Sequence, residues 1–419
     1  MRTPVPDYLE QVLAECHGDE GGEPADYIPE LAEAPLDRLA VAMCTPDGTL
    51  YCAGDAEVEF TIQSASKPFV YALALEDRGW KDVYNHVGTE PSGDAFNEIS
   101  LEAESGRPRN PMINIGALTT HSLIGPSDLD PSERFERVRA GLSAFAGREL
   151  TIDEEVLSSE MATADRNRSL AYMAKATGAL LGDPLDQVEG YIRQCSLTIT
   201  TADLAMMGAT LANAGVNPLT GRRVVSPLVV RQVLSVMTTC GMYDAAGDWV
   251  SAVGIPAKSG VSGCILGVLP GQVGIGTFSP ALDSVGNSVR GVQICQRLSE
   301  DMGLHLMGAV PSGQHTVRDI GSLTLDGREA TRIELQGVVR FSEAERVMRA
   351  LTELPEGDDP IVLDLSRVAE VDRVGQRLLL EGVRRLNLDG HDIALVDPED
   401  TLPDPDEGYR PTRISRDDI

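Results

Sequence analysis

The chain has 419 residues, enough for two or three domains, and its 42% hydrophobic and 4% aromatic content is that of an ordinary globular protein. Its 65 acidic residues against 35 basic ones give a formal net charge of −30. A surface this acidic repels phosphate backbones and anionic lipid heads, which argues against nucleic-acid and membrane partners.

Three further features narrow the class of protein. The N-terminal segment lacks an apolar core of signal-peptide length, and no uncharged apolar run approaches the about 18 residues that span a bilayer. The seven cysteines are scattered and form no CxxC pair, which is typical of reduced thiols in a cytoplasm. Because the six histidines show no ligand spacing such as HExxH, we expect no metal site and no cofactor.

The first half of the chain begins with mixed elements and continues as helices. Residues 5–35 predict a helix, a loop and a second helix. Two β-rich runs then surround Asp47 and Gly48, which is a good hairpin signal. From about 100 to 250, Ala, Leu, Met and charged residues at helical spacing, broken by Gly and Pro, predict a mostly helical segment.

Strands return after this helical segment. Residues 252–280 are dense in Val, Ile and Gly, and Pro270 and Gly271 mark a turn between strands. A helix is predicted over 291–307. We therefore expect an α/β plus all-α enzyme, in which early and late strands form one antiparallel sheet beside a helical subdomain.

The C-terminal part of the chain has a different pattern of predicted elements. Residues 308–322 are predicted to be a linker, and after them short β-runs alternate with amphipathic helices, which indicates a small α/β domain. The predicted domains are 1–308, 309–402, and a Pro-rich, charged, flexible tail over 403–419. The expected strands are TRIELQGVV, PIVLDLSRV and HDIALVDP, and the expected helices are SEAERVMRALTEL and VGQRLLLEGVRRLNLDG.

The stretch FTIQSASKPFVYALALED, residues 60–77, carries the first chemical motif. Pro68 suits the first turn of a helix, so a helix is predicted to begin close to Ser64. Ser64 and Lys67 are then three residues apart on one helical face, whereas Ser66 points about 100° away. The lysine can therefore reach Ser64, in an S-x-x-K spacing, and not Ser66.

This spacing can activate a nucleophile. A serine hydroxyl needs a base, and Lys67 can serve if burial and the positive helix end lower its pKa. The same helix start offers backbone N–H groups to an oxyanion. Alone, S-x-x-K is more often a helix cap beside a solvated lysine. The later Lys258-Ser259-Gly260 changes that balance, because S-x-x-K followed by a K-T-G strand, with Ser here replacing Thr, is the signature of penicillin-recognising serine enzymes.

Longer blocks give a narrower resemblance. The segments QSASKPFVYALALED, PRNPMINIGAL, SEMATADRNRSLAYM, GYIRQCSLTIT, CGMYDAAGDWV and AKSGVSGCILGVLPGQVGIGTFSP resemble the serine-dependent glutaminase family in wording and order, and with DYIPELA the resemblance covers residues 5–307. It implies a β-lactamase/DD-peptidase-like fold and hydrolysis of L-glutamine to L-glutamate and ammonia through an acyl-serine intermediate.

The resemblance also implies roles for five residues of the chemical step. Ser64 matches the nucleophile and Lys67 its basic partner. Tyr243 matches a tyrosine placed near the nucleophile for proton transfer, and Tyr191 a second pocket tyrosine. Val261 matches the residue whose backbone N–H completes the oxyanion hole with that of Ser64. We expect the four residues other than Lys67 to contact the substrate as well.

Four more residues match the groups that hold the substrate's amino and carboxylate ends: Tyr27, Asn114, Glu160 and Asn167. Glutamine carries an ammonium and a carboxylate on one carbon, so a buried Glu160 suits the former, and amide and phenol donors suit the latter. Glu160 and Asn167 are seven apart, so on a single helix they would face one pocket. Taken singly, Asn114 also fits a helix cap, Glu160 a solvated face, and Tyr191 and Tyr243 ordinary core-edge aromatics.

Residues 315–400 resemble the STAS domain of sulfate transporters and anti-sigma factor antagonists. The segment VLDLSRVAEVDRVGQRLLL matches D-x-S-x-V-x-x-x-D-[S/T]-x-G, except that Arg373 stands where the regulatory antagonists carry a phosphorylatable Ser or Thr. A phosphate switch is therefore not expected, and Ser366 is expected to shape the turn after its strand. The domain is interpreted as regulatory, binding a protein partner or its own copy, or else as a passive appendage.

Two other functions remain open on the sequence. One is another serine amidohydrolase of the same fold, such as a β-lactamase or peptidase, which the missing signal peptide disfavours. The other is a non-catalytic STAS-type regulator, which the intact Ser64, Lys67 and Tyr243 disfavour. The family also implies a homo-oligomer, a dimer or tetramer.

Overall fold

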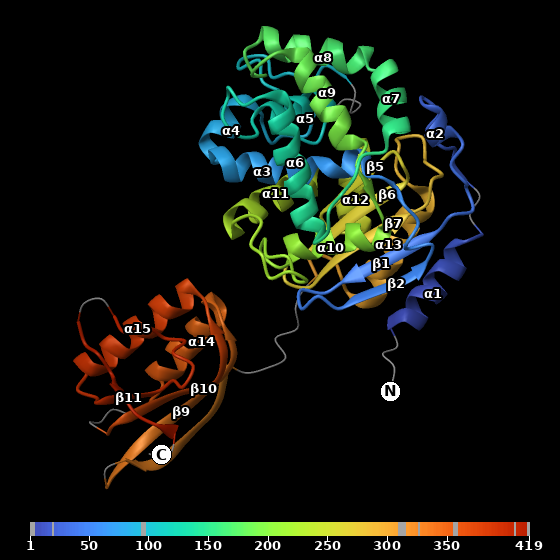
Figure 1. Ribbon diagram of the computed structural model, residues 1–419. Coiled ribbons are helices and arrows are strands. Elements are labelled where there is room, and N and C mark those ends of the chain that lie inside the picture. The colour runs from blue at the N-terminus through green and yellow to red at the C-terminus, as the bar shows by residue number, and fades with distance from the viewer. Residues whose placement is uncertain are drawn as a thin grey trace. The chain divides into compact units, whose positions relative to one another are not determined.

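The chain forms two compact units, Met1–Gly308 and Ala309–Ile419. This computed structural model describes residues 5–18, 21–93, 98–308, 316–325, 327–354, 359–405 and 408–416. Each unit has its own sheet and its own buried core, so each is described by itself (Figure 1).

The first unit is built on one antiparallel sheet with strand order β2-β1-β7-β6-β5. Pairing of Ala40 with Phe278 joins the early hairpin to the late strands, which confirms the predicted sheet. The two predicted turns, at Asp47-Gly48 and Pro270-Gly271, connect neighbouring strands. The strands are β1 (Ala40–Cys44), β2 (Leu50–Gly54), β5 (Ala257–Gly260), β6 (Cys264–Leu269) and β7 (Val273–Phe278).

Helices cover both faces of this sheet because its strands are apolar on both sides. Val41 and Met43 face a cluster with α1 (Val5–Cys16) and α13 (Val289–Met302), while Ala42 and Cys44 face α10 (Thr201–Ala212). Close approach of α10 depends on Gly274, where a Cβ would lie 2.0 Å from the backbone nitrogen of Ala209. The predicted final helix ends at Met302 rather than at 307, because Gly303 takes the left-handed conformation that terminates helices.

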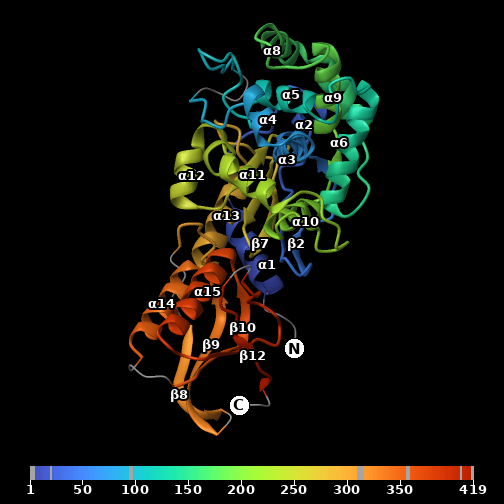
Figure 2. The same ribbon diagram turned by 90° about the vertical axis from the view of Figure 1, so that its left-hand side faces the viewer.

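Most of the remaining helices of the first unit gather beyond the sheet as the predicted helical subdomain, whereas Trp249 of α12 (Ala246–Ala252) packs into the core cluster on the α1 and α13 face (Figures 1 and 2). The long helical segment starts at Asn114, not near 100. An unpredicted two-residue ladder between Phe60–Thr61 (β3) and Thr198–Ile199 (β4) ties the segment before Ser64 to the subdomain. The helices are α2 (Pro29–Ala32), α3 (Lys67–Arg78), α4 (Trp80–His86), α5 (Asn114–Ser122), α6 (Pro131–Ala146), α7 (Glu154–Ala162), α8 (Asp165–Ala176), α9 (Pro184–Cys195), α11 (Pro227–Cys240) and α12 (Ala246–Ala252).

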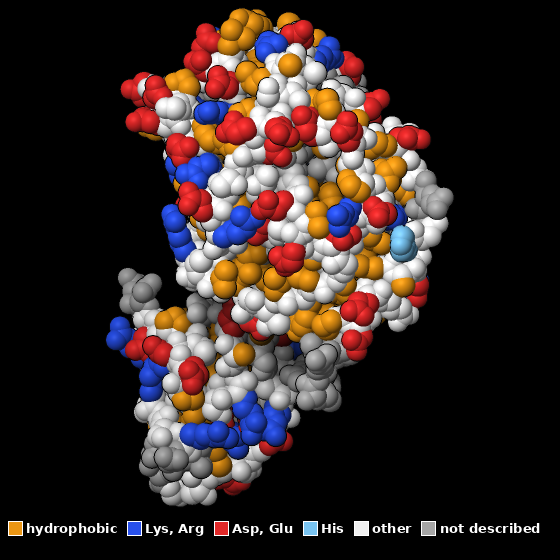
Figure 3. All heavy atoms as spheres, turned by 45° about the vertical axis from the view of Figure 1, so that its right-hand side comes forward, with side chains coloured by type: hydrophobic (Ala, Val, Ile, Leu, Met, Phe, Trp, Pro, Cys, Tyr) orange, Lys and Arg blue, Asp and Glu red, His pale blue; other side chains and the backbone are white. Residues whose placement is uncertain are grey.

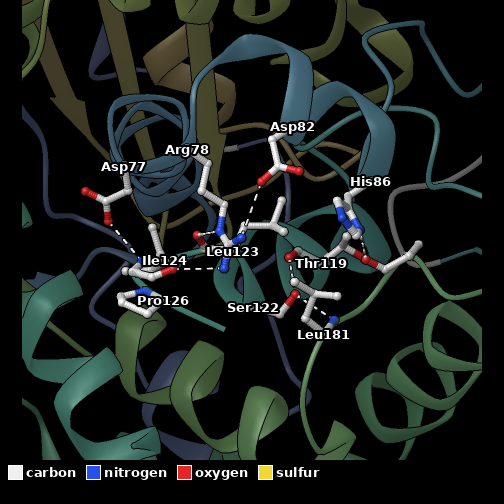
Figure 4. A network of polar contacts seen from close by, with 12 residues as sticks. Asp77, Arg78, Asp82, His86, Thr119, Ser122, Leu123, Ile124, Pro126 and Leu181 are labelled. Atoms are coloured by element: carbon white, nitrogen blue, oxygen red, sulfur yellow. Dashed lines mark hydrogen bonds and ion pairs between the residues drawn. The ribbon is translucent and has the colours of Figure 1, made fainter. Parts of the chain in front are cut away.

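A polar network ties the C-terminal ends of α3 and α5 together (Figure 4). Arg78 of α3 donates to the carbonyls of Leu123 and Gly125 just after α5, at 2.7 and 2.9 Å. Asp77 accepts from the Gly125 backbone N–H at 3.0 Å. Since α3 begins with Lys67 and α5 with Asn114, this network helps to fix the two helix starts relative to each other.

The second unit is a five-stranded sheet of order β12-β11-β10-β9-β8 with two helices on one face. Strand β8 runs antiparallel to β9 and the other neighbours are parallel, so the predicted alternation of strand and helix is confirmed (Figure 1). The elements are β8 (Val317–Leu325), β9 (Arg328–Val339), α14 (Phe341–Thr352), β10 (Ile361–Val371), α15 (Arg373–Leu388), β11 (Ile393–Val396) and β12 (Thr412–Arg413).

Three sequence predictions differ from this unit. Strand β8 occupies residues 317–322 of the expected linker, while residues 309–315 lie outside the described ranges. Thr412 and Arg413 of the expected tail pair with β11. Ser366 lies inside β10, at a bulge, rather than in a turn after it. The half-exposed, polar edge strands lack an apolar alternation, so their sequence reads as loop.

The surface and its charges match the composition. Figure 3 shows acidic side chains spread over one face of the first unit, with basic ones among them. Within the described residues, no helix is long and apolar enough to cross a membrane. The same residues contain no cluster of three or more His, Cys, Asp or Glu that could hold a metal ion.

Candidate active site

The turn that carries Ser64 is strained and buried. Residues Gln63–Ser66 form a 3-10 turn that leads into α3 at Lys67, so the predicted helix start is confirmed. Gln63 has a φ of 48°, which costs a non-glycine residue roughly 1–3 kcal/mol and persists only where the surroundings enforce it. One enforcing contact is the 2.8 Å hydrogen bond from the Ile62 backbone N–H to the Leu197 carbonyl.

Lys67 begins α3 directly after the turn that carries Ser64 and has almost no exposure to solvent. Its residue is 1% exposed, and its Nζ donates to Oδ1 of Asn114 at 2.8 Å. Burial lowers the pKa of Lys67 to about 8, because the charged ammonium loses its hydration. Among the described residues no carboxylate forms an ion pair with it. Lys67 is thus close to the neutral form that a base requires.

This burial predicts the pH dependence of turnover. Lysine acts as a base only when neutral, so kcat/KM should rise with pH through an apparent pKa of about 8. In Asn114→Asp, a carboxylate beside Nζ favours the ammonium and should move this limb up by about one pH unit or more. A pH series of initial rates measures both limbs. An unmoved limb in the variant would assign it to a group other than Lys67.

The segment that follows α11 brings Tyr243 to Ser64. Tyr243 starts a short 3-10 turn, Tyr243–Ala245, with a φ of 51°, a second strained backbone position at this site. Its side chain hydrogen-bonds the Ser64 side chain, and its hydroxyl donates to the Ser259 carbonyl at 3.3 Å. Burial raises its pKa above the ordinary value, although the contact with Ser64 opposes this, so the phenol keeps its proton.

A cavity of about 290 Å³ opens in front of Ser64. Seven of the nine residues singled out in the sequence line it: Tyr27, Ser64, Asn114, Glu160, Asn167, Tyr191 and Val261. The other two, Lys67 and Tyr243, reach it through Asn114 and Ser64, and Tyr243 also lines a separate cavity of about 620 Å³. The structure therefore brings all nine residues to one place.

The lining of the cavity includes a buried carboxylate. Oε1 of Glu160 accepts from the Tyr27 hydroxyl at 2.8 Å and from Nε2 of Gln63 at 3.2 Å. Burial raises the pKa of Glu160, while these two hydrogen bonds pull it back down. Tyr27 comes from the loop before α2, whose residues Ile28 and Leu31 pack on α7 and Val261. A fixed anionic group of this kind suits an ammonium ligand.

Asn114 connects Lys67 to other polar residues that line the cavity. Its Nδ2 lies 3.3 Å from Oδ1 of Asn167, and its Oδ1 accepts from the Tyr191 hydroxyl at 3.4 Å as well as from Lys67. Glu160 and Asn167 do not share a helix, as the sequence suggested, but lie on α7 and α8. The helical conformation is interrupted between them at Thr163 and Ala164, but residues of both helices line the same cavity.

Six lining residues were not singled out from the sequence: Gln63, Thr163, Ala164, Arg166, Ile192 and Cys195. Gln63 is the most informative, because it orients Glu160 and immediately precedes Ser64. Arg166 stands next to Asn167 and pairs with Glu98 at 3.0 Å. The available sequence signal for these residues was adjacency in the chain, since Gln63 precedes Ser64 and Arg166 precedes Asn167. Burial raises the pKa of Cys195 to about 12, so its thiol is unreactive.

Comparison with known families decides what this constellation belongs to. The Glutaminase family model matches residues 22–307, more than half of the chain. The chain belongs to the glutaminase family. A second match, to the family described as "Mlab, STAS domain", covers residues 324–404, so the predicted STAS-like domain is confirmed.

Relatives match either nearly the whole chain or little more than its first unit. A glutaminase of Corynebacterium efficiens is 50% identical over 404 residues, covering 96% of this chain and 95% of the relative. A glutaminase of Clavibacter michiganensis is 49% identical over 300 residues, covering 72% of this chain and 91% of the relative. The catalytic unit of the family therefore also occurs with little additional chain.

Solved structures of glutaminases share the fold. The crystal structure of Mglu matches with a TM-score of 0.88 and 53% identity, covering 96% of this chain and 100% of that one. Mglu in its glutamate form matches with a TM-score of 0.88 and 49% identity over the same shares. The probable glutaminase ybaS matches with a TM-score of 0.71 and 40% identity, covering 73% of this chain and 98% of that one.

Proposed function

We propose that this glutaminase hydrolyses L-glutamine to L-glutamate and ammonia by acyl transfer to Ser64. One observation carries the proposal. A single small cavity is lined by Ser64, by the buried Glu160 carboxylate and by Asn114, which accepts a hydrogen bond from the buried Lys67. The glutamate form of Mglu supports an amino acid of this skeleton as the ligand.

The residues divide the reaction among them. Lys67 takes the Ser64 proton, directly or through Tyr243, which hydrogen-bonds Ser64. Ser64 attacks the side-chain amide, and the backbone N–H groups of Ser64 and Val261 hold the oxyanion. The ammonia that leaves takes a proton from Tyr243 or Lys67, and water then cleaves the acyl-serine, with Lys67 as base.

The far end of the cavity holds the amino acid. Glu160 binds the α-ammonium, and Asn114, Asn167 and Tyr191 supply amide and phenol groups for the α-carboxylate. The sequence suggested Tyr27 as a donor to the carboxylate, but because its hydroxyl donates to Glu160 we assign it to the ammonium end instead. The site holds the α-carbon groups of the substrate at one place and attacks its side-chain amide at another, so it selects the length of the substrate side chain. Asparagine should therefore place its amide short of Ser64.

A substrate panel tests the reaction class. Ammonia release is measured from L-glutamine, L-asparagine and buffer alone, with and without phosphate, and acylation by penicillin is followed in parallel. We expect release from glutamine, little from asparagine and no penicilloyl adduct. A penicilloyl adduct without ammonia release would favour a β-lactamase or peptidase, and neither reaction would favour a silent regulator.

The second unit is proposed to bind a protein partner or its own copy rather than to catalyse. Because a relative matches over little more than the catalytic unit, a fragment of residues 1–308 should keep kcat/KM for glutamine close to that of the full chain. Steady-state kinetics of the two proteins measures this. A large loss of kcat in a fragment that unfolds at the same temperature would instead make the second unit part of the active enzyme.

The assembly and compartment remain proposals as well. We infer a homo-oligomer, a dimer or tetramer, and sedimentation velocity of the full chain tests it. We also infer a cytoplasmic location, because all seven cysteines are free and six of them are buried. Cell fractionation would test the location.

A further inference from the structure

The most unusual buried charge outside the assigned residues is Lys258. Only four of the 35 basic residues are lysines, namely Lys67, Lys81, Lys175 and Lys258, and the rest are arginines. Lys81 and Lys175 are exposed, whereas Lys67 and Lys258 are buried. A chain that uses arginine almost everywhere on its surface thus places half of its lysines in the core of one site.

Lys258 has no carboxylate to explain its burial. Its residue is 0% exposed in the middle of β5, and no described acidic side chain forms an ion pair with it. Burial and the neighbouring charge of Lys67 hold its pKa well below the ordinary value. Burying a lysine without an anionic partner is costly, so a plain structural role would be served better by an apolar side chain.

The hydrogen bond and the ring contact of the Lys258 amine both involve Tyr243 or the carbonyl that Tyr243 binds. The Lys258 Nζ donates to the Ser259 carbonyl at 2.7 Å, the same oxygen that accepts from the Tyr243 hydroxyl at 3.3 Å. Nζ also lies 4.1 Å from the centre of the Tyr243 ring, a cation–π distance when the amine is charged. Neutral or charged, the amine can therefore hold both the ring and the carbonyl to which its hydroxyl is bonded.

The backbone around Tyr243 is held against the same strand. A Cβ on Gly241 would lie 1.8 Å from the Ala257 carbonyl oxygen, so the segment approaches β5 as closely as glycine permits. The Ser259 backbone N–H donates to the Gly241 carbonyl at 3.4 Å. These contacts hold the strained backbone, and the Lys258 amine adds a contact to the phenol ring and to the Ser259 carbonyl.

We propose that Lys258 is the positioning residue of Tyr243, holding its hydroxyl against Ser64 through the ring and the Ser259 carbonyl. This role rests on the proposed acyl transfer, and specifically on the route in which Tyr243 carries the proton. Lys258 does not line the substrate cavity, and its amine bonds the carbonyl that also accepts from Tyr243, so we expect its effect to pass through Tyr243. Loss of the amine should lower kcat and leave KM for glutamine nearly unchanged.

A double-mutant cycle tests this role. Lys258→Met removes the amine at similar volume, and we expect kcat to fall about 10²-fold, as for a misplaced proton carrier. In Tyr243→Phe, which has no hydroxyl to position, the same change should cost less than about threefold. Lys81→Met, which removes an exposed lysine, is the matched control and should leave kcat unchanged. Thermal unfolding shows whether each variant is folded. If Lys258→Met is not folded, Lys258→Gln, which keeps an N–H donor, replaces it in the cycle.

A second readout separates this proposal from the proposed function. The same cycle is run on the rate at which a fluorophosphonate labels Ser64, which needs Ser64 activation but no glutamine. Non-additive losses in labelling support the role of Lys258 even if glutamine is not the substrate. Losses by the same factor in both backgrounds, or no loss in Lys258→Met, would overturn it, because a structural lysine acts independently of the Tyr243 hydroxyl.

Discussion

Ser64→Ala is expected to lower kcat for L-glutamine by at least about 10⁴-fold, whereas Ser66→Ala should leave kcat nearly unchanged. Only Ser64 lines the cavity and contacts Tyr243. The Ser66 hydroxyl is committed elsewhere, since it donates to the Gln63 carbonyl at 2.7 Å and accepts from Nε2 of Gln194 at 2.9 Å. Initial rates of ammonia release measure both variants.

The two serines should also separate in stability. Ser66→Ala leaves buried polar groups of Gln63 and Gln194 unpaired, so the free energy of unfolding should drop by about 1–3 kcal/mol. In Ser64→Ala the Tyr243 hydroxyl keeps its hydrogen bond to the Ser259 carbonyl, so the unfolding temperature should stay near that of the wild type. Equal losses of turnover from both variants would contradict the assignment of the nucleophile.

Glu160→Gln is expected to lower kcat/KM for L-glutamine by about 10²-fold or more, because it removes the one carboxylate that a buried α-ammonium can pair with. The amide keeps the shape of the side chain and can still accept from Tyr27 and Gln63. The loss should therefore reflect charge rather than packing.

A substrate without the ammonium provides the matched control. The wild type should hydrolyse glutaramate, which lacks the amino group, far more slowly than glutamine, and Glu160→Gln should hydrolyse it about as well as the wild type does. Steady-state kinetics of both substrates with both enzymes gives the comparison. A variant that loses the same factor on both substrates would place the effect of Glu160 in the chemical step and not in ammonium recognition.

Local sequence signals were enough for the turns between neighbouring strands and for the pairing of Ser64 with Lys67 as a candidate motif. Asp47-Gly48 and Pro270-Gly271 determine two turns, and residues in these strands are apolar on both sides, as a doubly covered sheet requires. The three-residue spacing of Ser64 and Lys67 predicts their common face. These features depend on neighbours in the chain, so the printed sequence contains them.

Features made by distant contacts could not be predicted in the same way. The role of Gln63 depends on Glu160, 97 residues away, and nothing in the local pattern links them. Strand β8 is an exposed edge whose polar residues resemble a linker. The family resemblance placed Glu160 and Asn167 in one cavity, but their positions on two helices depend on the break at Thr163.

The acyl-serine intermediate is tested most directly by partitioning with hydroxylamine. L-Glutamine, L-glutamate γ-methyl ester and L-glutamate γ-p-nitroanilide should form one γ-glutamyl-Ser64 species, so hydroxylamine should yield hydroxamate and glutamate in one ratio for all three. Both products should disappear in Ser64→Ala. A ratio that depends on the leaving group would show that the substrates share no acyl-enzyme, and it would contradict acyl transfer to Ser64.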